Sequence, residues 1–366
     1  MDLNLKTEQL ITKSVLGIVR LWFNRFILWF YTKAFTILLT IFGSLIGRKR
    51  MSHNNGIGAR GKVTIVDNPE LIAHPFFEPN KTYPCRIRHA GASFNDDAMR
   101  VVRSMSLKFA DDQFKSPFDL ELNTGKVALF WSVASFMRFA KYKKTKYGIQ
   151  YHKYYKNYPA GVKGAQSGMR RNPDSFSNLN FYSQTPLFYI GSDDVNRYAK
   201  YRVVPFEDVQ ETGLLNAYDM SNLSENQRIL PGEKRTRNYL KEEYKKRIAS
   251  GIIKYKLQIQ LHTAADDDDD ELFNCCREWE EDSHPWLELA VIEIEKILTW
   301  EESCILAFSL GNLPESLGVI PAKSIYDYNS LNYMRKNSEL ARKSRVWSFN
   351  LFGVPSELPD NDDRNQ

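Results

Sequence analysis

The amino-acid sequence predicts an α+β fold, in which a closed antiparallel β-barrel carries flanking helices and is preceded by an N-terminal membrane helix. Three observations support this prediction: one long strand with strict apolar–polar alternation, several shorter strand-like runs between helical stretches, and one long apolar run near the N-terminus. The composition agrees with it, because 366 residues can bury a large core and 43% hydrophobic and 26% charged residues are ordinary for a folded protein.

The apolar run comes first along the chain. Residues 15–30 are apolar and aromatic but contain Arg20, Asn24 and Arg25, whereas residues 26–46 are interrupted mainly by Lys33. A run of this length can cross a hydrocarbon layer about 30 Å thick. The same residues could instead lie flat at the interface, with their basic side chains reaching the head groups. The sequence leaves both arrangements open, and we expect residues 1–49 to attach the protein to a membrane.

A basic cluster follows the apolar run directly, since residues 47–50 read Gly-Arg-Lys-Arg. Such clusters stay on the cytoplasmic side of membranes, so we expect the domain that follows on the cytoplasmic or an equivalent positive side. A cleaved signal peptide fits poorly, because the apolar region is too long and no small-residue cleavage pattern stands out. The sequence does not indicate the organelle.

The remaining elements follow from periodicity. In residues 253–262 the side chains of Ile253, Tyr255, Leu257, Ile259 and Leu261 share one face of a strand, and polar side chains occupy the other. Shorter strands are expected at 62–67, 104–110, 118–122, 200–206 and 287–297. Helices are expected at 127–140, 235–250 and 299–308, with a pair near 325–346. Antiparallel strands with helices before and after them favour a closed barrel with helical additions.

The most informative residue is His53, which lies in the run Arg-Met-Ser-His at 50–53 and precedes a glycine-rich turn at 56–61. A lone histidine is more often a solvated loop residue, but further motifs follow in order. They are residues 82–91, 103–109, 119–125, 171–174, 284–286 and 312–318. Together they resemble the catalase-related haem proteins, especially the allene oxide synthase branch that consumes fatty-acid hydroperoxides. The resemblance covers roughly residues 50–350, leaving 351–366 as a polar tail.

This resemblance implies a catalase-like β-barrel of about eight strands, a bound haem b and a set of site residues. His53 would be the distal acid/base, Ser52 would hydrogen-bond its imidazole, and Asn123 would position the peroxide. Other members of the set would hold the haem: Arg50 and Arg88 at the propionates, Phe136 against the porphyrin face, and Arg335 beside the iron ligand.

One position departs from the family pattern. The family places its axial tyrosine four residues after an arginine, and the matching arginine here is Arg335. The residue four positions later is Glu339, and a carboxylate is a weaker donor than a phenolate. Tyr333 and Tyr328 are close in sequence, but neither has an arginine four residues before it. If Glu339 occupies the axial position, we expect haem to bind weakly or not at all.

The net charge and the cysteine spacing bear on possible binding partners and on the redox compartment. The net charge of +6 is modest, and the Lys/Tyr interleaving at 151–156 is not accompanied by a nucleic-acid motif, so we expect no nucleic-acid binding. The four cysteines are not spaced as a zinc or redox motif, which suggests a reducing compartment.

Three functions remain open on this basis. The first is a membrane-attached haem enzyme acting on lipid hydroperoxides, with an apolar substrate passing from the bilayer into the pocket. The second is a haem-deficient pseudoenzyme that binds a lipid or another apolar ligand. The third is a structural subunit with protein partners in a membrane assembly.

Overall fold

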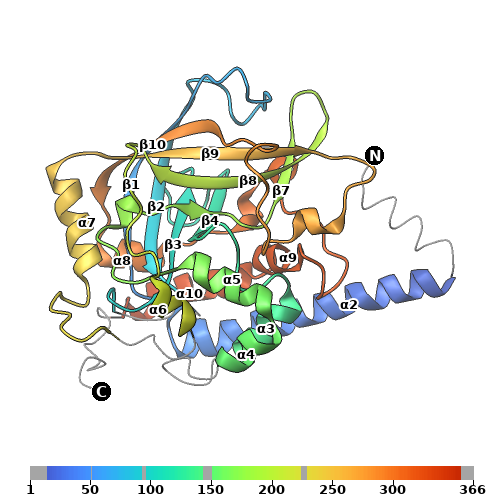
Figure 1. Cartoon of the computed structure of the whole chain (residues 1–366), viewed down its shortest axis with the longest axis horizontal. Helices are drawn as coiled ribbons and strands as arrows, with labels where there is room; N and C mark the ends of the chain where they lie inside the picture. The colour runs from blue at the N-terminus through green and yellow to red at the C-terminus, as the bar shows by residue number, and fades with distance from the viewer. Residues whose placement is uncertain (1–14, 51, 93–95, 143–150, 224–228, 356–366) are drawn as a thin grey trace.

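The computed structural model describes residues 15–50, 52–92, 96–142, 151–223 and 229–355. The first 14 residues of the expected membrane segment and residues 356–366 of the expected polar tail lie outside the described residues. The described chain consists of a β-barrel with helices gathered mainly along one side (Figure 1).

The barrel is closed by eight antiparallel strands. They are β1 (Gly56–Ile65), β2 (Thr82–Gly91), β3 (Val101–Lys108), β4 (Asp119–Thr124), β6 (Phe181–Tyr182), β8 (Asn196–Pro205), β9 (Ile253–Thr263) and β10 (Leu287–Ile297). Their order is β1-β10-β9-β8-β6-β4-β3-β2, and the ring closes because β2 pairs with both β3 and β1. Two short strands extend it, with β5 (Met169–Arg170) on β3 and β7 (Leu187–Ile190) on β8. The predicted antiparallel barrel is confirmed.

Alternation along the strands places one set of side chains inside the barrel. In β9, Tyr255, Leu257 and Ile259 are fully buried, and each alternates with a more exposed polar residue. Ile292 of β10 and Leu107 of β3 join the same core from other strands. The strand predicted at 253–262 therefore matches β9, and burial of its apolar face stabilises the barrel.

The first strand begins earlier than expected. The glycine-rich stretch predicted as a turn at 56–61 is the first half of β1, paired with both β2 and β10. Glycine is required there because neighbouring backbone comes very close. A Cβ at Gly61 would lie 1.9 Å from the carbonyl oxygen of Glu293, and one at Gly56 would lie 2.5 Å from that of His89.

The helices lie mainly along one side of the barrel (Figure 1). They are α2 (Val15–Leu38), η1 (Leu39–Ile46), α3 (Val133–Tyr142), α4 (Tyr151–Asn157), α5 (Pro159–Gly168), α6 (Ala217–Ser221), α7 (Tyr239–Ser250), α8 (Trp300–Ile305), α9 (Ser330–Lys336) and α10 (Glu339–Phe352). Short 3₁₀ turns are η2 (Phe176–Asn178), η3 (Asp270–Phe273), η4 (Leu310–Asn312) and η5 (Glu315–Leu317). The helix expected at 127–140 starts only at Val133, because Ser132 caps it by accepting a hydrogen bond from the amide of Ser135.

The N-terminal helix packs against the C-terminal helices. Segment η1 is π-helical and continues α2, and together they form one helix, Leu16–Ile46, long and apolar enough to cross a membrane by length and composition alone. Leu28 packs with Leu331 of α9. The hydroxyl of Ser44 donates a 2.6 Å hydrogen bond to the carbonyl oxygen of Ala341 in α10. Helix α2 runs beneath the barrel and projects past it at its N-terminal end (Figure 1).

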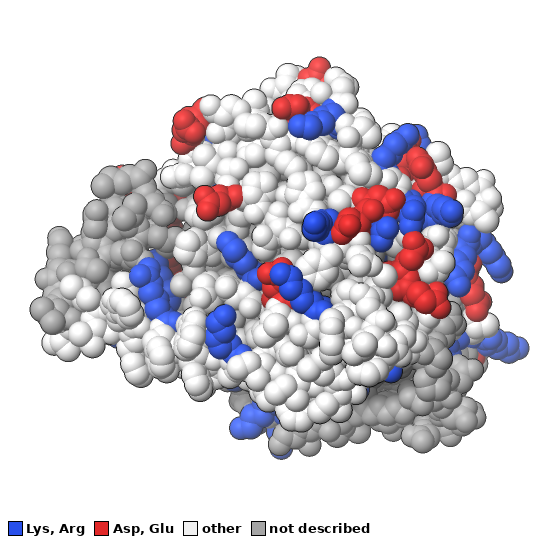
Figure 2. Space-filling model, turned by 180° about the vertical axis from the view of Figure 1, so that it is seen from behind, with Lys and Arg blue, Asp and Glu red and all other residues white. Residues whose placement is uncertain are grey.

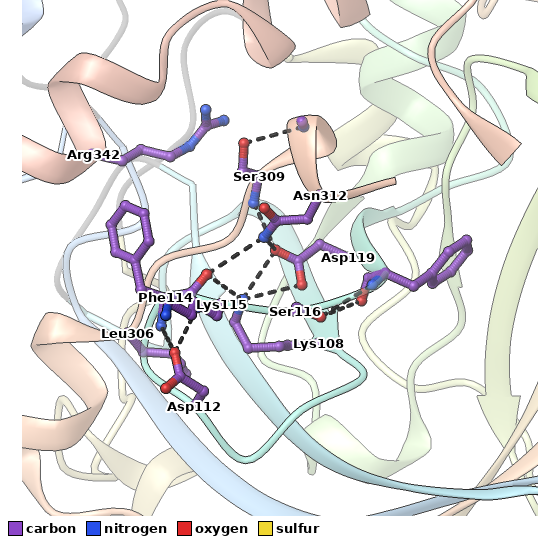
Figure 3. A network of polar contacts seen from close by, with 12 residues as sticks. Lys108, Asp112, Phe114, Lys115, Ser116, Asp119, Leu306, Ser309, Asn312 and Arg342 are labelled. Atoms are coloured by element: carbon purple, nitrogen blue, oxygen red, sulfur yellow. Dashed lines mark hydrogen bonds and ion pairs between the residues drawn. The ribbon is translucent and has the colours of Figure 1, made fainter. Parts of the chain in front are cut away.

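A buried ion pair joins the barrel to the segment that follows α8. Nζ of Lys108 lies 3.1 Å from both carboxylate oxygens of Asp119, and both side chains are fully buried. The carboxylate of Asp119 also accepts hydrogen bonds from the amide of Ser309 and from the side chain of Asn312, at 2.8 Å each (Figure 3). This network fixes Phe308 and η4 against β3 and β4.

Charged side chains of both signs are mixed on the surface. The face drawn in Figure 2 shows Lys and Arg interspersed with Asp and Glu, without a continuous basic area. Ion pairs on the barrel explain part of this mixing, for example Glu293 with Lys62 and Lys254. Nucleic-acid binding would favour a basic stripe or patch, which this face does not show.

Candidate active site

One large cavity lies between the barrel and the helices. Its volume is about 600 Å³, within the range of small-molecule sites. Its wall comes from the segment before β1, from β2 to β4, and from α3, α9 and α10, while α2 and η1 supply Phe35, Leu39, Gly43 and Ser44. The cavity brings together His53, Ser52, Asn123, Phe136 and Arg335, which are far apart in the sequence.

His53 is held in an unusual backbone conformation at this wall. Its φ of +60° lies in the left-handed region, where histidine is less rare than most residues, and its amide donates to the carbonyl oxygen of Ala92 at 3.2 Å. The hydroxyl of Ser52 lies 2.8 Å from Nδ1 of His53. Because that contact engages Nδ1, proton exchange with a ligand would take place through Nε2. Non-glycine residues at positive φ cluster at functional sites.

Asn123 enters the cavity from the barrel. It lies in β4, opposite Ser104 of β3 and Tyr182 of β6. Side chains alternate along a strand, so Asn123 faces the cavity region while Leu122 is buried in the core. Its side-chain amide can donate and accept hydrogen bonds. Asn123 and His53 thus offer two polar groups at one cavity.

Three arginines gather beside His53, and two of them, Arg88 and Arg345, are buried. Arg88 donates to the carbonyl oxygens of His53 at 2.8 Å and of Asn54 at 3.0 Å. Arg50 donates to the carbonyl oxygen of Leu306 at 2.5 Å, and Arg345 donates to the same oxygen at 3.4 Å. Burial lowers the pKa of all three, that of Arg50 to about 10. For Arg88 and Arg345, mutual repulsion within the group also lowers the pKa.

The positive charge at the cavity is largely uncompensated. Five arginines line it, namely Arg50, Arg88, Arg335, Arg342 and Arg345, and among the described residues Glu121 is the one acidic side chain in the lining. Glu121 pairs with Arg342 at 3.1 Å and more distantly with Arg335 at 3.9 Å. In the same described part of the chain, Nε of Arg345 is buried without a hydrogen-bond partner. The chemistry of such a cluster suits an anionic group.

The rest of the wall is apolar and aromatic. Phe136 of α3 contacts Phe130 at 5.0 Å and Phe35 of α2 at 5.9 Å between ring centres. Phe139, Met169, Leu331 and Met334 extend this part of the lining. The cavity therefore combines a cationic region with an aromatic one, which suits a molecule that carries both an acid group and an apolar body.

Glu339 lies outside the cavity. It is the first residue of α10, is half exposed, and pairs with Lys343 at 2.8 Å. Arg335 belongs to α9, so the break at 337–338 prevents the four-residue spacing from sharing one helical face. Ser338 lines the cavity instead, and no tyrosine does so among the described residues. Glu339 therefore does not line this cavity, and its place at the axial position of a haem stays a prediction.

Comparison with known proteins shows which family the chain belongs to. No family model matches the chain. It is 35% identical over 305 residues to the allene oxide synthase-lipoxygenase protein of Plexaura homomalla, covering 82% of this chain and 28% of that protein. It is 29% identical over 333 residues to the linolenate 9R-lipoxygenase of a Nostoc strain, covering 85% and 40%. A bacterial catalase superposes with a TM-score of 0.66 at 14% identity, covering 86% and 60%. This chain is a catalase-related protein.

The catalase-related protein spans between a quarter and a half of the length of these two curated relatives. Its residues fit part of a haem site. The arginine cluster, with the unsatisfied Nε of Arg345, suits the two carboxylates of a haem, and Phe136 offers an aromatic wall. The described lining offers no tyrosine as an iron ligand, because Ser338 lines the cavity and Glu339 pairs with Lys343 outside it.

Several residues that line the cavity of the catalase-related protein were not predicted from the sequence. Arg342 and Arg345 lie three residues apart on α10, a spacing that shares a helical face and could have indicated them. Cys275 lines the cavity beside the loop at 128–130, where its thiol donates to the carbonyl oxygen of Phe130 at 3.3 Å. The contributions of α2 and η1 had no local signal, since an apolar helix does not reveal which face it buries.

Proposed function

We propose that this catalase-related protein binds and metabolises fatty-acid hydroperoxides in the cavity while its N-terminal helix holds it on a membrane. The observation that carries the proposal is the composition of the wall. His53 and Asn123 supply polar groups for a peroxide, the arginine cluster suits a carboxylate, and the phenylalanines suit an acyl chain. The relatives' names point the same way, since one is an allene oxide synthase-lipoxygenase protein and the other is named for linolenate.

Each residue has a distinct role in this proposal. Nε2 of His53 accepts the proton of the hydroperoxide in the tautomer in which Nδ1–H donates to the hydroxyl of Ser52, a contact that also fixes the ring. Asn123 holds the peroxide oxygens by hydrogen bonding. Arg50, Arg88 and Arg345 attract the carboxylate of the ligand or of a haem. Because no tyrosine lines the cavity among the described residues, we assign no step to haem.

The test uses the full-length protein in mild detergent. An 18-carbon fatty-acid hydroperoxide is added and the products are followed by mass spectrometry, while the absorbance spectrum of the same sample reports haem. The matched control ligand is the hydroxy fatty acid of the same chain, which lacks the reactive bond. The proposal expects conversion of the hydroperoxide that His53→Ala removes. The proposal would be overturned if the hydroperoxide decayed at the same slow rate with native protein, with His53→Ala protein and in buffer alone.

A second function is favoured by the placement of Ser338 and Glu339. Without an axial donor, the protein would be a haem-deficient pseudoenzyme that binds a lipid in the cavity or serves as a structural subunit of a membrane assembly. It would show no haem absorbance and no turnover, yet would bind the hydroxy fatty acid. Stoichiometric co-purification of other proteins would favour the structural subunit over the lipid-binding form.

A further inference from the structure

Helices α2 and η1 present a broad apolar face that the rest of the protein leaves uncovered. Trp22 is 73% exposed, and other large apolar side chains of the same helix are similarly open to solvent. They are Leu16, Phe23, Phe26, Trp29, Phe30, Ile37, Leu38, Ile41, Phe42 and Ile46. An exposed apolar surface of this extent marks an interaction site.

Helix α10 continues the same face. Leu340, Trp347, Leu351 and Phe352 are exposed on it, with Trp347 56% exposed. The two helices are joined, because Ser44 bonds to Ala341 and the guanidinium of Arg48 lies 5.8 Å from the ring centre of Phe352. The side chain of Arg48 also donates to the carbonyl oxygen of Phe352 at 3.0 Å. Two segments almost 300 residues apart in sequence thus form one apolar surface.

The packing of α2 and η1 shows how this surface can meet a membrane. Leu28, Thr32, Thr36 and Ser44 are buried at helical spacing and face α9 and α10. A membrane-spanning helix needs about 20 residues surrounded by lipid or by other membrane-embedded protein. Here the second half of the helix has a folded domain along one side, so only the opposite side can meet lipid. This geometry suits a helix that lies in the interface.

Charge identifies the partner as an anionic bilayer. Residues 15–50 contain Arg20, Arg25, Lys33 and the cluster at 48–50, and no acidic residue. Basic side chains around an apolar helix favour anionic head groups, at about 1 kcal/mol for each Lys or Arg near the surface. Another folded protein would be expected to carry acidic groups opposite these charges and would satisfy the apolar face less completely along its length.

We propose that α2, η1 and α10 form one interfacial surface that lies flat on an anionic bilayer without crossing it, and that fatty-acid hydroperoxides enter the cavity past η1. Entry past η1 rests on the proposed function, whereas the surface does not. The structural link is that η1 belongs to both places. Its Leu39, Gly43 and Ser44 line the cavity, while its Ile41, Phe42 and Ile46 are exposed on the apolar surface described above.

The first test measures binding of full-length protein to preformed vesicles. Phosphatidylcholine vesicles with and without 30% phosphatidylglycerol are compared by flotation, with folding checked by circular dichroism. Trp347→Glu and Phe352→Glu together should reduce binding to the anionic vesicles at least tenfold. The matched control is Ile252→Glu, which changes a 53% exposed apolar residue between α7 and β9 and should bind normally. Unchanged binding of the Trp347→Glu/Phe352→Glu variant would overturn the proposal that α10 belongs to the membrane-binding surface.

The second test asks whether the helix crosses the bilayer. The four native cysteines are buried, so a cysteine placed at Arg20 or Lys49, two exposed basic residues that would lie at the head groups, can be labelled selectively. Each variant is bound to sealed vesicles and treated with a membrane-impermeant maleimide. A helix lying flat leaves both positions labelled from outside. Protection of one position until detergent is added would show that the helix spans.

The third test separates entry from chemistry. Turnover of a hydroperoxide presented in vesicles should fall at least tenfold in the Trp347→Glu/Phe352→Glu variant, whereas turnover in detergent micelles should be unchanged. An equal loss in both settings would overturn entry past η1. Absence of turnover in native protein in both settings would instead reject the proposed function. The flotation and labelling results would still show whether α2, η1 and α10 bind the bilayer without crossing it.

Discussion

Arg335 lies in the last turn of α9, and Glu339 is the first residue of α10, so the two side chains leave the chain from different helices. Glu339 is consequently free of the cavity and pairs with Lys343. Ser338 faces the cavity in its place and donates a 2.6 Å hydrogen bond to the carbonyl oxygen of Met334. The break between α9 and α10 therefore decides that Ser338 and not Glu339 lines the cavity. A four-residue spacing in the sequence does not reveal such a break.

The first prediction compares two tyrosine substitutions. Glu339→Tyr should leave haem content unchanged, because the new phenol would point to solvent. Ser338→Tyr should raise haem content several-fold, because its phenol would enter the cavity near the arginines, which favour a phenolate. Haem per chain is measured by the pyridine haemochrome assay after expression with added haem, with Ser338→Ala as the control. A rise with Glu339→Tyr alone would contradict the placement of Glu339.

The second prediction concerns His53. Replacing it with alanine should lower kcat/KM for a fatty-acid hydroperoxide by about two to four orders of magnitude, the usual contribution of a general acid or base. Affinity for the hydroxy fatty acid, measured by calorimetry, should change little. Ser52→Ala should cause a smaller loss, because the imidazole remains but its orientation is no longer fixed. Native activity in His53→Ala would remove this residue from the chemistry.

The third prediction tests the buried pair in Figure 3. Burial is the largest influence on both groups and lowers the pKa of Lys108 while raising that of Asp119. Lys108→Met should lower the free energy of unfolding by about 3–5 kcal/mol, because it leaves Asp119 unpaired.

The double variant Lys108→Met/Asp119→Leu provides the control. Replacing both partners by apolar residues should recover part of the loss, since no buried charge is left. The measurement is denaturant unfolding in mild detergent at pH 7. A double variant that loses the sum of the losses in Lys108→Met and Asp119→Leu would show that the two groups act independently, which would contradict this account.

The fourth prediction concerns acid. His89 is fully buried in the barrel, where its ring lies 4.9 Å from that of Phe176, and burial lowers its pKa from 6.5 to about 3. Between these values the unfolded chain binds the proton and the folded protein does not, so stability falls as the pH drops from 6.5 towards 3. The full effect is about 5 kcal/mol.

His89→Phe should remove this contribution and flatten the pH dependence. Denaturant unfolding at pH 7.0, 5.5 and 4.5 compares the two proteins, and the free energy of unfolding of native protein should fall relative to that of the variant as the pH falls. Parallel curves for native and variant protein would mean that the acid sensitivity arises at other groups.

The sequence predicted those features that periodicity or ordered motifs record. Alternation at 253–262 identified β9, and the ordered motifs identified the catalase-related fold and placed His53, Asn123, Phe136 and Arg335 at one cavity. The start of β1 was missed because glycines that permit close strands look like turn residues. The contact between Phe35 and Phe136 could not be predicted, since it joins two helices about 100 residues apart.

The central claim is that one cavity receives the peroxide end of a fatty-acid hydroperoxide beside His53 and Asn123. A crystal or cryo-electron microscopy structure with the hydroxy fatty acid bound tests it most directly. We predict that the hydroxyl lies within about 3.2 Å of the side chains of His53 and Asn123, that the acyl chain lies against Phe136, and that the carboxylate meets the arginines. A fatty acid bound elsewhere, with this cavity unoccupied at saturating ligand, would contradict the account.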